Sequence, residues 1–147
     1  MLQKLAQPDA VSDIKGGEKY PGITGTVRFY QMPQGVLLDV AITGLPLENA
    51  SGFFGFHIHE GNSCTPGDFS DTLGHYNKKN TQHPRHAGDL PPLLSHGGNA
   101  NMAFMTDRFS VVDVIGKTVV VHSKADDFIT QPAGNAGEKI ACGVITR

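Results

Sequence analysis

The feature that most constrains the fold is the alternation of apolar and other side chains in residues 35–45. Apolar residues stand at every second position from Val36 to Ile42, which is the period of a β-strand with one buried face. Other short segments are rich in β-branched, aromatic or apolar residues, and none has a helical period. These are residues 24–31, 53–60, 99–106, 114–123 and 139–145. The sequence therefore predicts an all-β sandwich or barrel of about seven or eight short antiparallel strands.

The overall composition supports this class and excludes others. Eighteen Gly and nine Pro in 147 residues favour strands joined by turns, and the length fits one domain spanning residues 1–147. The net charge of −2 gives no basic field for nucleic acid, and no apolar run is long enough for a membrane span. Residues 1–20 are polar and mixed, and we expect them to be partly disordered.

The N-terminal residues also bear on the compartment. Residues 1–7 lack the apolar core of a secretory signal. The chain is therefore expected to be cytoplasmic, or to be the mature form of a secreted or periplasmic protein.

Two segments interrupt the strand pattern. Residues 61–92 and 124–137 are long, polar and rich in Gly and Pro. Loops longer than about 12–15 residues are usually functional or disordered. The first segment carries His75, His83, His86 and Asp89, so we interpret it as an ordered loop that forms a site.

Histidine is unusually concentrated, because five of the seven lie between His57 and His86. His57 and His59 flank Ile58 in a predicted strand, where alternate residues point to the same face. Taken alone, such a pair is either an exposed pair of strand histidines or half of a metal site.

The next cluster favours a metal. His75, His83, His86 and Asp89 supply three imidazoles and one carboxylate on one loop, a set suited to tetrahedral Zn²⁺. Four protein ligands leave no open position, so the predicted zinc site is structural. The alternative is a solvated polar loop.

Two histidines remain. His122 ends the apolar run 119–121 and is either a core or edge residue or a further ligand, since imidazole-rich sites suit Cu(II). His96 lies in the Ser95-His96-Gly97-Gly98 segment, and we predict an exposed residue in a turn.

Several motifs together resemble the copper/zinc superoxide dismutase family, in the family's order from Thr24 to Ile145. They are Gly55-Phe56-His57-Ile58-His59-Glu60, Gly74-His75-Tyr76-Asn77, Arg85-His86-Ala87-Gly88-Asp89-Leu90, Val121-His122-Ser123-Lys124-Ala125-Asp126-Asp127, and Gly134-Asn135-Ala136-Gly137 leading into Ala141-Cys142-Gly143-Val144-Ile145. The resemblance implies an eight-stranded antiparallel Greek-key barrel or sandwich with two long functional loops.

The resemblance also implies roles for the site residues. Copper would be held by His57, His59, His75 and His122, and zinc by His75, His83, His86 and Asp89. His75 would bridge the two metals and supply a proton during catalysis. Asp126 would bond the free ring nitrogens of His57 and His83, which fixes the orientation of both rings.

Cys64 and Cys142 are the only cysteines. Two reduced thiols are the default for a cytosolic protein, whereas the resemblance implies an intrachain disulfide between them.

The chain departs from the family pattern near Cys142. Three residues before it, where most members carry an arginine that attracts superoxide to copper, this chain has Lys139. The positive charge is kept, but the planar fork of donors is lost. The loop 124–137 is also shorter than in eukaryotic members, with Gln131-Pro132 in place of charged guiding residues. The alternative for Lys139 is a solvated residue at the start of a strand.

The implied function is dismutation of superoxide to O₂ and hydrogen peroxide by alternate reduction and oxidation of the copper. The competing hypotheses are a non-catalytic copper/zinc-binding relative that stores or donates metal, and a zinc-only scaffold. The implied partner is the superoxide anion, and the chain could form a homodimer.

Overall fold

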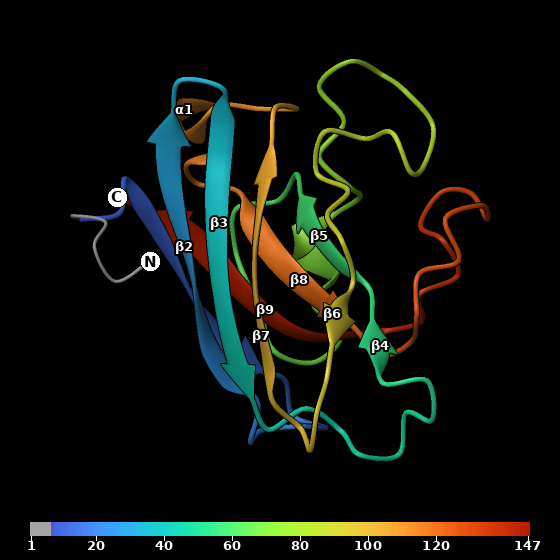
Figure 1. Ribbon diagram of the computed structural model, residues 1–147. Coiled ribbons are helices and arrows are strands. Elements are labelled where there is room, and N and C mark those ends of the chain that lie inside the picture. The colour runs from blue at the N-terminus through green and yellow to red at the C-terminus, as the bar shows by residue number, and fades with distance from the viewer. Residues whose placement is uncertain (1–6) are drawn as a thin grey trace.

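The computed structural model describes residues 7–147 and is built almost entirely of antiparallel strands, as predicted. Seven of them form one sheet that curls into a half-barrel, in the order β5-β8-β9-β1-β2-β3-β7 (Figure 1). Their bounds are β1 (Ala10–Gly16), β2 (Thr24–Met32), β3 (Gly35–Thr43), β5 (Phe56–His59), β7 (Ala100–Thr106), β8 (Thr118–His122) and β9 (Lys139–Thr146). Strands β4 (Phe53–Phe54) and β6 (Leu93–Leu94) form a second, two-stranded sheet.

The core lies on the concave face of the half-barrel. In β3, the alternation that the sequence displays places Val36, Leu38, Val40 and Ile42 inward, each at most 1% exposed. β2 adds Val27 and Phe29, and Val119 and Val121 of β8 pack against the same cluster. One continuous apolar core therefore holds both ends of the sheet together.

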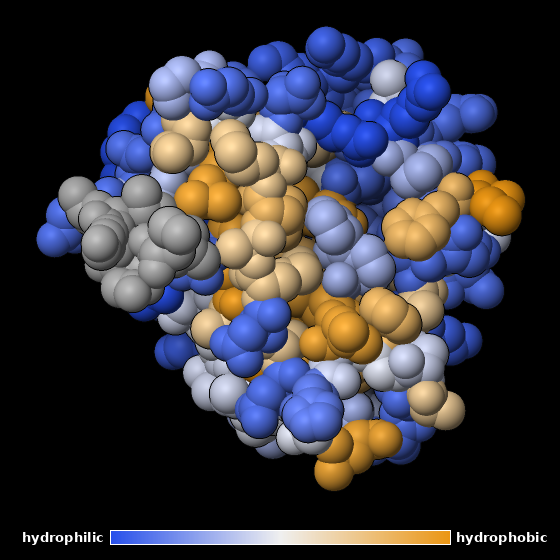
Figure 2. Space-filling view, in the orientation of Figure 1, coloured by the Kyte–Doolittle hydropathy of each residue, from blue (hydrophilic) through white to orange (hydrophobic). Residues whose placement is uncertain are grey.

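The outward face of the sheet is mixed in character. Figure 2 shows apolar surface spread among polar side chains on the side of the molecule that carries β2, β3 and β7. Among the exposed large apolar residues, Met105 lies on β7, Leu94 on β6 and Phe53 on β4. Among residues 7–147, no helix has both the length and the apolar character that crossing a bilayer would require.

Three local expectations need correction. No strand was predicted within residues 1–20, but Ala10–Gly16 is the strand β1, paired with both β2 and β9. The disorder expected for part of this segment stays a prediction, and residues 1–6 lie outside the described part. The inward residues of β1 are Ala10, Ser12 and Ile14. Because one is small and one is polar, the alternation of apolar and polar residues is weak in this part of the sequence.

The predicted strand 53–60 is divided into β4 and β5 at Gly55, whose amide bonds the carbonyl of Lys124 rather than a neighbouring strand. The predicted strand 114–123 begins only at Thr118. Before it lies the one-turn helix α1 (Val111–Val114), capped by reciprocal hydrogen bonds between Ser110 and Asp113. A four-residue helix is too short to show a helical period in the sequence.

Candidate metal centre

Strand β5 carries core residues on one face and histidines on the other. Phe56 and Ile58 belong to the apolar core, whereas His57 and His59 point to the outer face. Both histidines are nevertheless buried, at 0% and 2% exposure. The sheet alone would leave them in solvent, so the segments that cover this outer face must bury them.

The first long loop provides the cover by pairing with the free edge of β5. The Tyr76 amide donates to the carbonyl of Ile58, and the Ile58 amide donates to the carbonyl of Gly88, both at 2.8 Å. These contacts bring His75 opposite His59 and Asp89 opposite His57. Backbone pairing therefore places the loop ligands beside the strand ligands.

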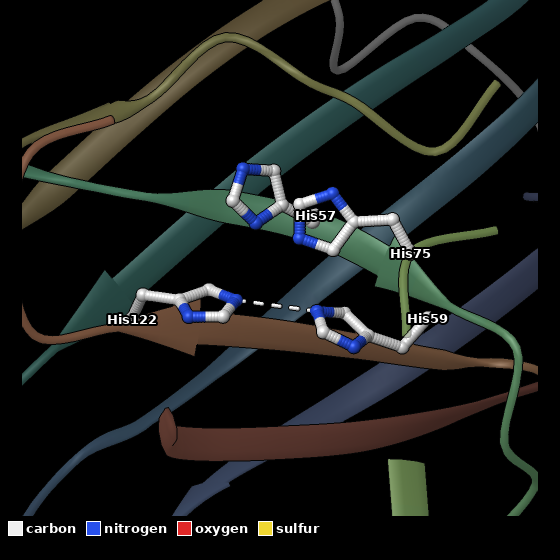
Figure 3. Close-up of side chains that lie close together, drawn as sticks. All are labelled: His57, His59, His75 and His122. Atoms are coloured by element: carbon white, nitrogen blue, oxygen red, sulfur yellow. Dashed lines mark hydrogen bonds between the residues drawn. The ribbon is translucent and has the colours of Figure 1, made fainter. Parts of the chain in front are cut away.

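Four histidines form the first compact donor group. One ring nitrogen each of His57, His59, His75 and His122 lies within 4.8 Å of the others, and Figure 3 shows the four rings turned toward a common centre. The Nε2 atoms of His59 and His122 face each other at 3.2 Å. His122 joins the group from the end of β8, where the pairing with β9 shifts register. The four residues expected to hold copper are thus together.

A second donor group adjoins the first. Nδ1 of His75 lies 2.8 Å from Oδ1 of Asp89 and 3.2 Å from Nδ1 of His86. Oδ2 of Asp89 lies 3.1 Å from Nδ1 of both His83 and His86. Tetrahedral zinc bonds of about 2.0–2.1 Å give ligand-to-ligand distances of about 3.3 Å. The spacing therefore fits the zinc set expected from the sequence.

The two groups share His75, which turns one nitrogen to each. His57 also lies within 4.8 Å of His75, His83 and Asp89. We assign it to the first group because its Nε2 is engaged by Asp126, 2.8 Å away, which leaves its Nδ1 for the four-histidine centre. The distances above place His86 in the second group.

Protein acceptors fix the orientation of most of these rings. The two carboxylate oxygens of Asp126 bond Nε2 of His57 and Nε2 of His83, the latter at 2.7 Å. Nδ1 of His59 donates to the carbonyl of Leu73 at 2.8 Å, and Nδ1 of His122 to that of Gly137 at 3.3 Å. In each contact one ring nitrogen carries the proton. The other ring nitrogen of the neutral imidazole keeps its lone pair, which metal binding requires.

The donor chemistry fits metal ions, because three buried ring nitrogens form no hydrogen bond. Within residues 7–147, Nδ1 of His57, Nε2 of His75 and Nδ1 of His83 are buried and accept or donate no hydrogen bond. Buried polar atoms are normally satisfied. The first two atoms face the four-histidine centre and the third faces Asp89. These orphaned atoms therefore lie where the two ligand sets need donors.

Burial keeps the imidazoles of His57 and His122 neutral. Burial lowers the pKa of His57 to about 4, although its hydrogen bond to Asp126 works in the opposite direction. Burial likewise lowers the pKa of His122 to about 3. Burial alone would raise the pKa of Asp126, but hydrogen bonds from His57 and His83 hold it down to about 2. At neutral pH, His57 and His122 are thus neutral imidazoles and Asp126 is an ionised carboxylate.

Lys139 lies next to the four-histidine group. Its Nζ donates to Oγ1 of Thr72 at 2.7 Å and to the carbonyl of Leu73 at 2.9 Å. The Leu73 carbonyl also accepts from His59, so the ammonium and a candidate ligand share one acceptor. Partial burial lowers the pKa of Lys139. The side chain is therefore held in place rather than free in solvent.

The disulfide implied by the resemblance is confirmed. Cys64 in the first loop is bonded to Cys142 in β9, and both pack against Phe69 and Val120. His96 is exposed and lies in a tight turn with Asn99, as predicted.

Sequence reasoning missed the residues that act through their main chain or through their small size. The carbonyls of Leu73 and Gly137 orient His59 and His122. Gly134 has φ +71°, and a Cβ at this position would lie 2.0 Å from Oδ1 of Asp126. The Gly134-Asn135-Ala136-Gly137 motif was recognised in the sequence. The role of its Gly137 carbonyl was missed, because a main-chain acceptor does not depend on the identity of the side chain.

The comparisons with known proteins agree with this geometry. A family model described as copper/zinc superoxide dismutase matches residues 23–145. The chain belongs to the copper/zinc superoxide dismutase family. It is 32% identical to the Cu-Zn superoxide dismutase of Deinococcus radiodurans, over 95% of this chain and 85% of that one. It is 36% identical to Cu-Zn superoxide dismutase 2 of Aquifex aeolicus, over 84% and 79% of the two chains.

The fold comparison supports the same family. The crystal structure of a SOD-like protein from Bacillus subtilis aligns with a TM-score of 0.77 and 27% identity, covering 91% of this chain and 96% of that one. The curled antiparallel sheet expected from the superoxide dismutase resemblance is thereby confirmed.

Proposed function

We propose that this protein dismutates superoxide, converting two superoxide anions and two protons into O₂ and hydrogen peroxide. The observation that carries the proposal is the position of His75 between two complete donor groups. Its Nε2 faces the four-histidine group without a hydrogen-bond partner, and its Nδ1 lies among His86 and Asp89. One imidazole therefore joins a centre suited to copper with a centre suited to zinc.

The two metals follow from the donor sets. His57, His59, His75 and His122 would hold copper, and His75, His83, His86 and Asp89 would hold zinc. Copper, when bound, supplies the one-electron oxidation and reduction that superoxide dismutation requires. Zinc has no redox chemistry and, with four protein ligands, has a structural role.

The protein's own groups handle protons and orientation. Nε2 of His75 is the position at which the shared imidazole can hold a proton and deliver it to a reduced oxygen species beside the centre. Asp126 keeps His57 and His83 in the tautomer that presents Nδ1 to the metals. Lys139 supplies the positive charge that draws an anion toward the four-histidine group.

Activity of the metal-loaded protein tests the proposal. Protein loaded with both copper and zinc should inhibit superoxide-dependent dye reduction. The His122→Ala variant, which loses one candidate copper ligand, should lose that inhibition. The matched control is His96→Ala, because His96 is exposed and outside both donor groups. Wild-type protein that binds both metals and still leaves dye reduction unchanged would contradict the proposal.

A second candidate is a copper- and zinc-binding protein without turnover. Two observations favour it: Lys139 replaces the usual arginine and engages Thr72 and Leu73, and the Bacillus subtilis structure is described only as SOD-like. Both candidates predict that copper and zinc bind. They differ in the dye-reduction assay, where only the first predicts inhibition.

A further inference from the structure

Gln131, in the second long loop, pairs with the main chain of a zinc-site histidine. Its Oε1 accepts the amide of His83 at 2.9 Å, and its Nε2 donates to the carbonyl of the same residue at 2.7 Å. Nε2 also donates to the carbonyl of Ile129 at 3.1 Å. The side-chain amide thus bonds His83 as a neighbouring strand would, with one donor and one acceptor.

The same loop also holds the ring of His83. Asp126 bonds Nε2 of that ring at 2.7 Å. Gln131 bonds the peptide groups on either side of the Cα of His83. The backbone and the imidazole are therefore fixed from one loop, which leaves Nδ1 facing Oδ2 of Asp89 at 3.1 Å. A ligand that is positioned before metal arrives loses less conformational freedom on binding.

Arg108 supports the same stretch of main chain, residues 83–86, from a different part of the fold. Nη1 of Arg108 donates to the carbonyl of Pro84 at 2.7 Å and to that of His86 at 3.1 Å. Arg108 lies between β7 and α1, outside both loops. The main chain that carries His83 and His86 is therefore held from two directions by groups that are not themselves ligands.

We propose that Gln131 is a positioning residue for zinc, which raises zinc affinity by holding the backbone of His83 without touching the metal. The inference rests on the proposed assignment of zinc to His75, His83, His86 and Asp89. It requires an amide at this position, because the group must donate to two carbonyls and accept from an N–H. A carboxylate cannot donate to the carbonyls of His83 and Ile129.

Zinc affinity of the full-length protein, measured by competition with a chromophoric chelator, tests the inference. Gln131→Glu preserves size and removes the donor, and Gln131→Met preserves length and removes all three hydrogen bonds. We expect each to weaken zinc binding by about 10–100-fold, the range typical for residues that support a ligand. Copper affinity should stay within a few-fold of wild type. Gln34→Glu is the matched control, since Gln34 is exposed in a turn.

Two further measurements separate positioning from general stability and from the metal assignment. Cobalt in the zinc site should show an altered visible spectrum in Gln131→Glu and an unchanged one in Gln34→Glu. Unchanged zinc affinity in both Gln131 variants overturns the inference, even if their melting temperatures fall. Asp89→Ala serves as the reference. If it loses zinc while the Gln131 variants do not, only the inference fails; if it also retains zinc, the zinc assignment and the inference both fail.

Discussion

Among the residues around the candidate metal centre, Gly134 leaves no room for a side chain. Its φ of +71° favours glycine, and the position of its missing Cβ lies 2.0 Å from Oδ1 of Asp126 and 2.6 Å from Nε2 of His83. Any larger residue must therefore separate the carboxylate from the imidazole that it orients. The contact between Asp126 and His83 therefore requires a residue without a Cβ at position 134.

We predict that Gly134→Ala weakens zinc binding at least tenfold, because Asp126 is displaced from His83. Gly97→Ala is the control, since Gly97 has a similar φ of +61° but open space around its Cβ position. The control variant should lose only about 1 kcal/mol of unfolding free energy, because alanine adopts a positive φ less readily than glycine. Equal zinc affinity in both variants, measured by chelator competition, would contradict the role given to Gly134.

The charge of Lys139 should govern the rate with superoxide. Lys139→Glu is expected to lower the second-order rate constant about tenfold or more, with both metals still bound, because the attraction for the anion becomes repulsion. Lys139→Arg should maintain or raise the rate, since a guanidinium restores directed donors. Pulse radiolysis at low salt measures these rates directly.

The matched control for this charge reversal is Lys79→Glu, which changes an exposed lysine in the first loop. The rate of the wild type should also fall with added salt, which screens charges beyond about 10 Å at 0.1 M. A Lys139→Glu variant with the wild-type rate would show that another cation, or none, guides the substrate.

At the scale of elements, the first loop is attached to the sheet by covalent and non-covalent links. The Cys64–Cys142 bond joins it to β9, and the segment that follows supplies the Leu73 carbonyl for His59 and Lys139. We predict that the double variant Cys64→Ser, Cys142→Ser melts at a lower temperature, by up to roughly 15 °C, because the unfolded chain regains the entropy of a long loop. Calorimetry of the metal-loaded protein checks this; an unchanged transition would contradict it.

A carboxylate within the same loop should titrate below its usual range. Asp71 accepts hydrogen bonds from the Ser63 and Thr65 side chains and from the Thr65 amide, and these contacts lower its pKa. The folded pKa is depressed, so the stabilisation is complete above the unfolded value near 3.8 and is lost as the pH falls through the folded value. The NMR shift of the Thr65 amide should therefore titrate with a midpoint below 3.8. A midpoint at or above that value would exclude these contacts.

The elements were predictable where the core pattern is strong. β3 shows four large apolar residues at alternate positions, and its sequence bounds differ from the structure by two residues at one end. β1 was missed because its inward Ser12 interrupts the apolar alternation. The break at Gly55 was missed because it arises from the pairing of Gly55 with Lys124, a contact between distant parts of the chain.

For the whole molecule, the two metals are expected to contribute unequally to stability. The proposed zinc ligands all lie on one loop, whereas three of the four proposed copper ligands lie on strands that the core already fixes. We predict that adding zinc alone to metal-free protein raises the melting temperature more than adding copper alone, because zinc binding must order the loop. Calorimetry of the metal-free, zinc-only and copper-only forms tests this. A larger rise with copper alone would contradict the assignment.

The candidate ligand residues were predictable from the sequence because histidines are few enough to stand out when five of seven are clustered. Their grouping in space required the resemblance, since the separation of His59 from His122 in the chain gives no sign that their Nε2 atoms lie 3.2 Å apart. The contact of Gln131 with His83 could not be predicted, because it joins a neutral side chain to main-chain groups.

The alternation in β5 has a consequence for mutational tolerance. Phe56 and Ile58 face the core while His57 and His59 face the candidate metal centre, so adjacent positions are under unrelated constraints. In a saturation library, positions 56 and 58 should accept apolar residues of similar volume and reject polar ones. Positions 57 and 59 should instead accept several residue types when the library is selected for protein abundance. When it is selected for activity, they should accept only histidine. An insertion or deletion of one residue in this strand would exchange the two sets, so the strand tolerates substitution far better than a change in length.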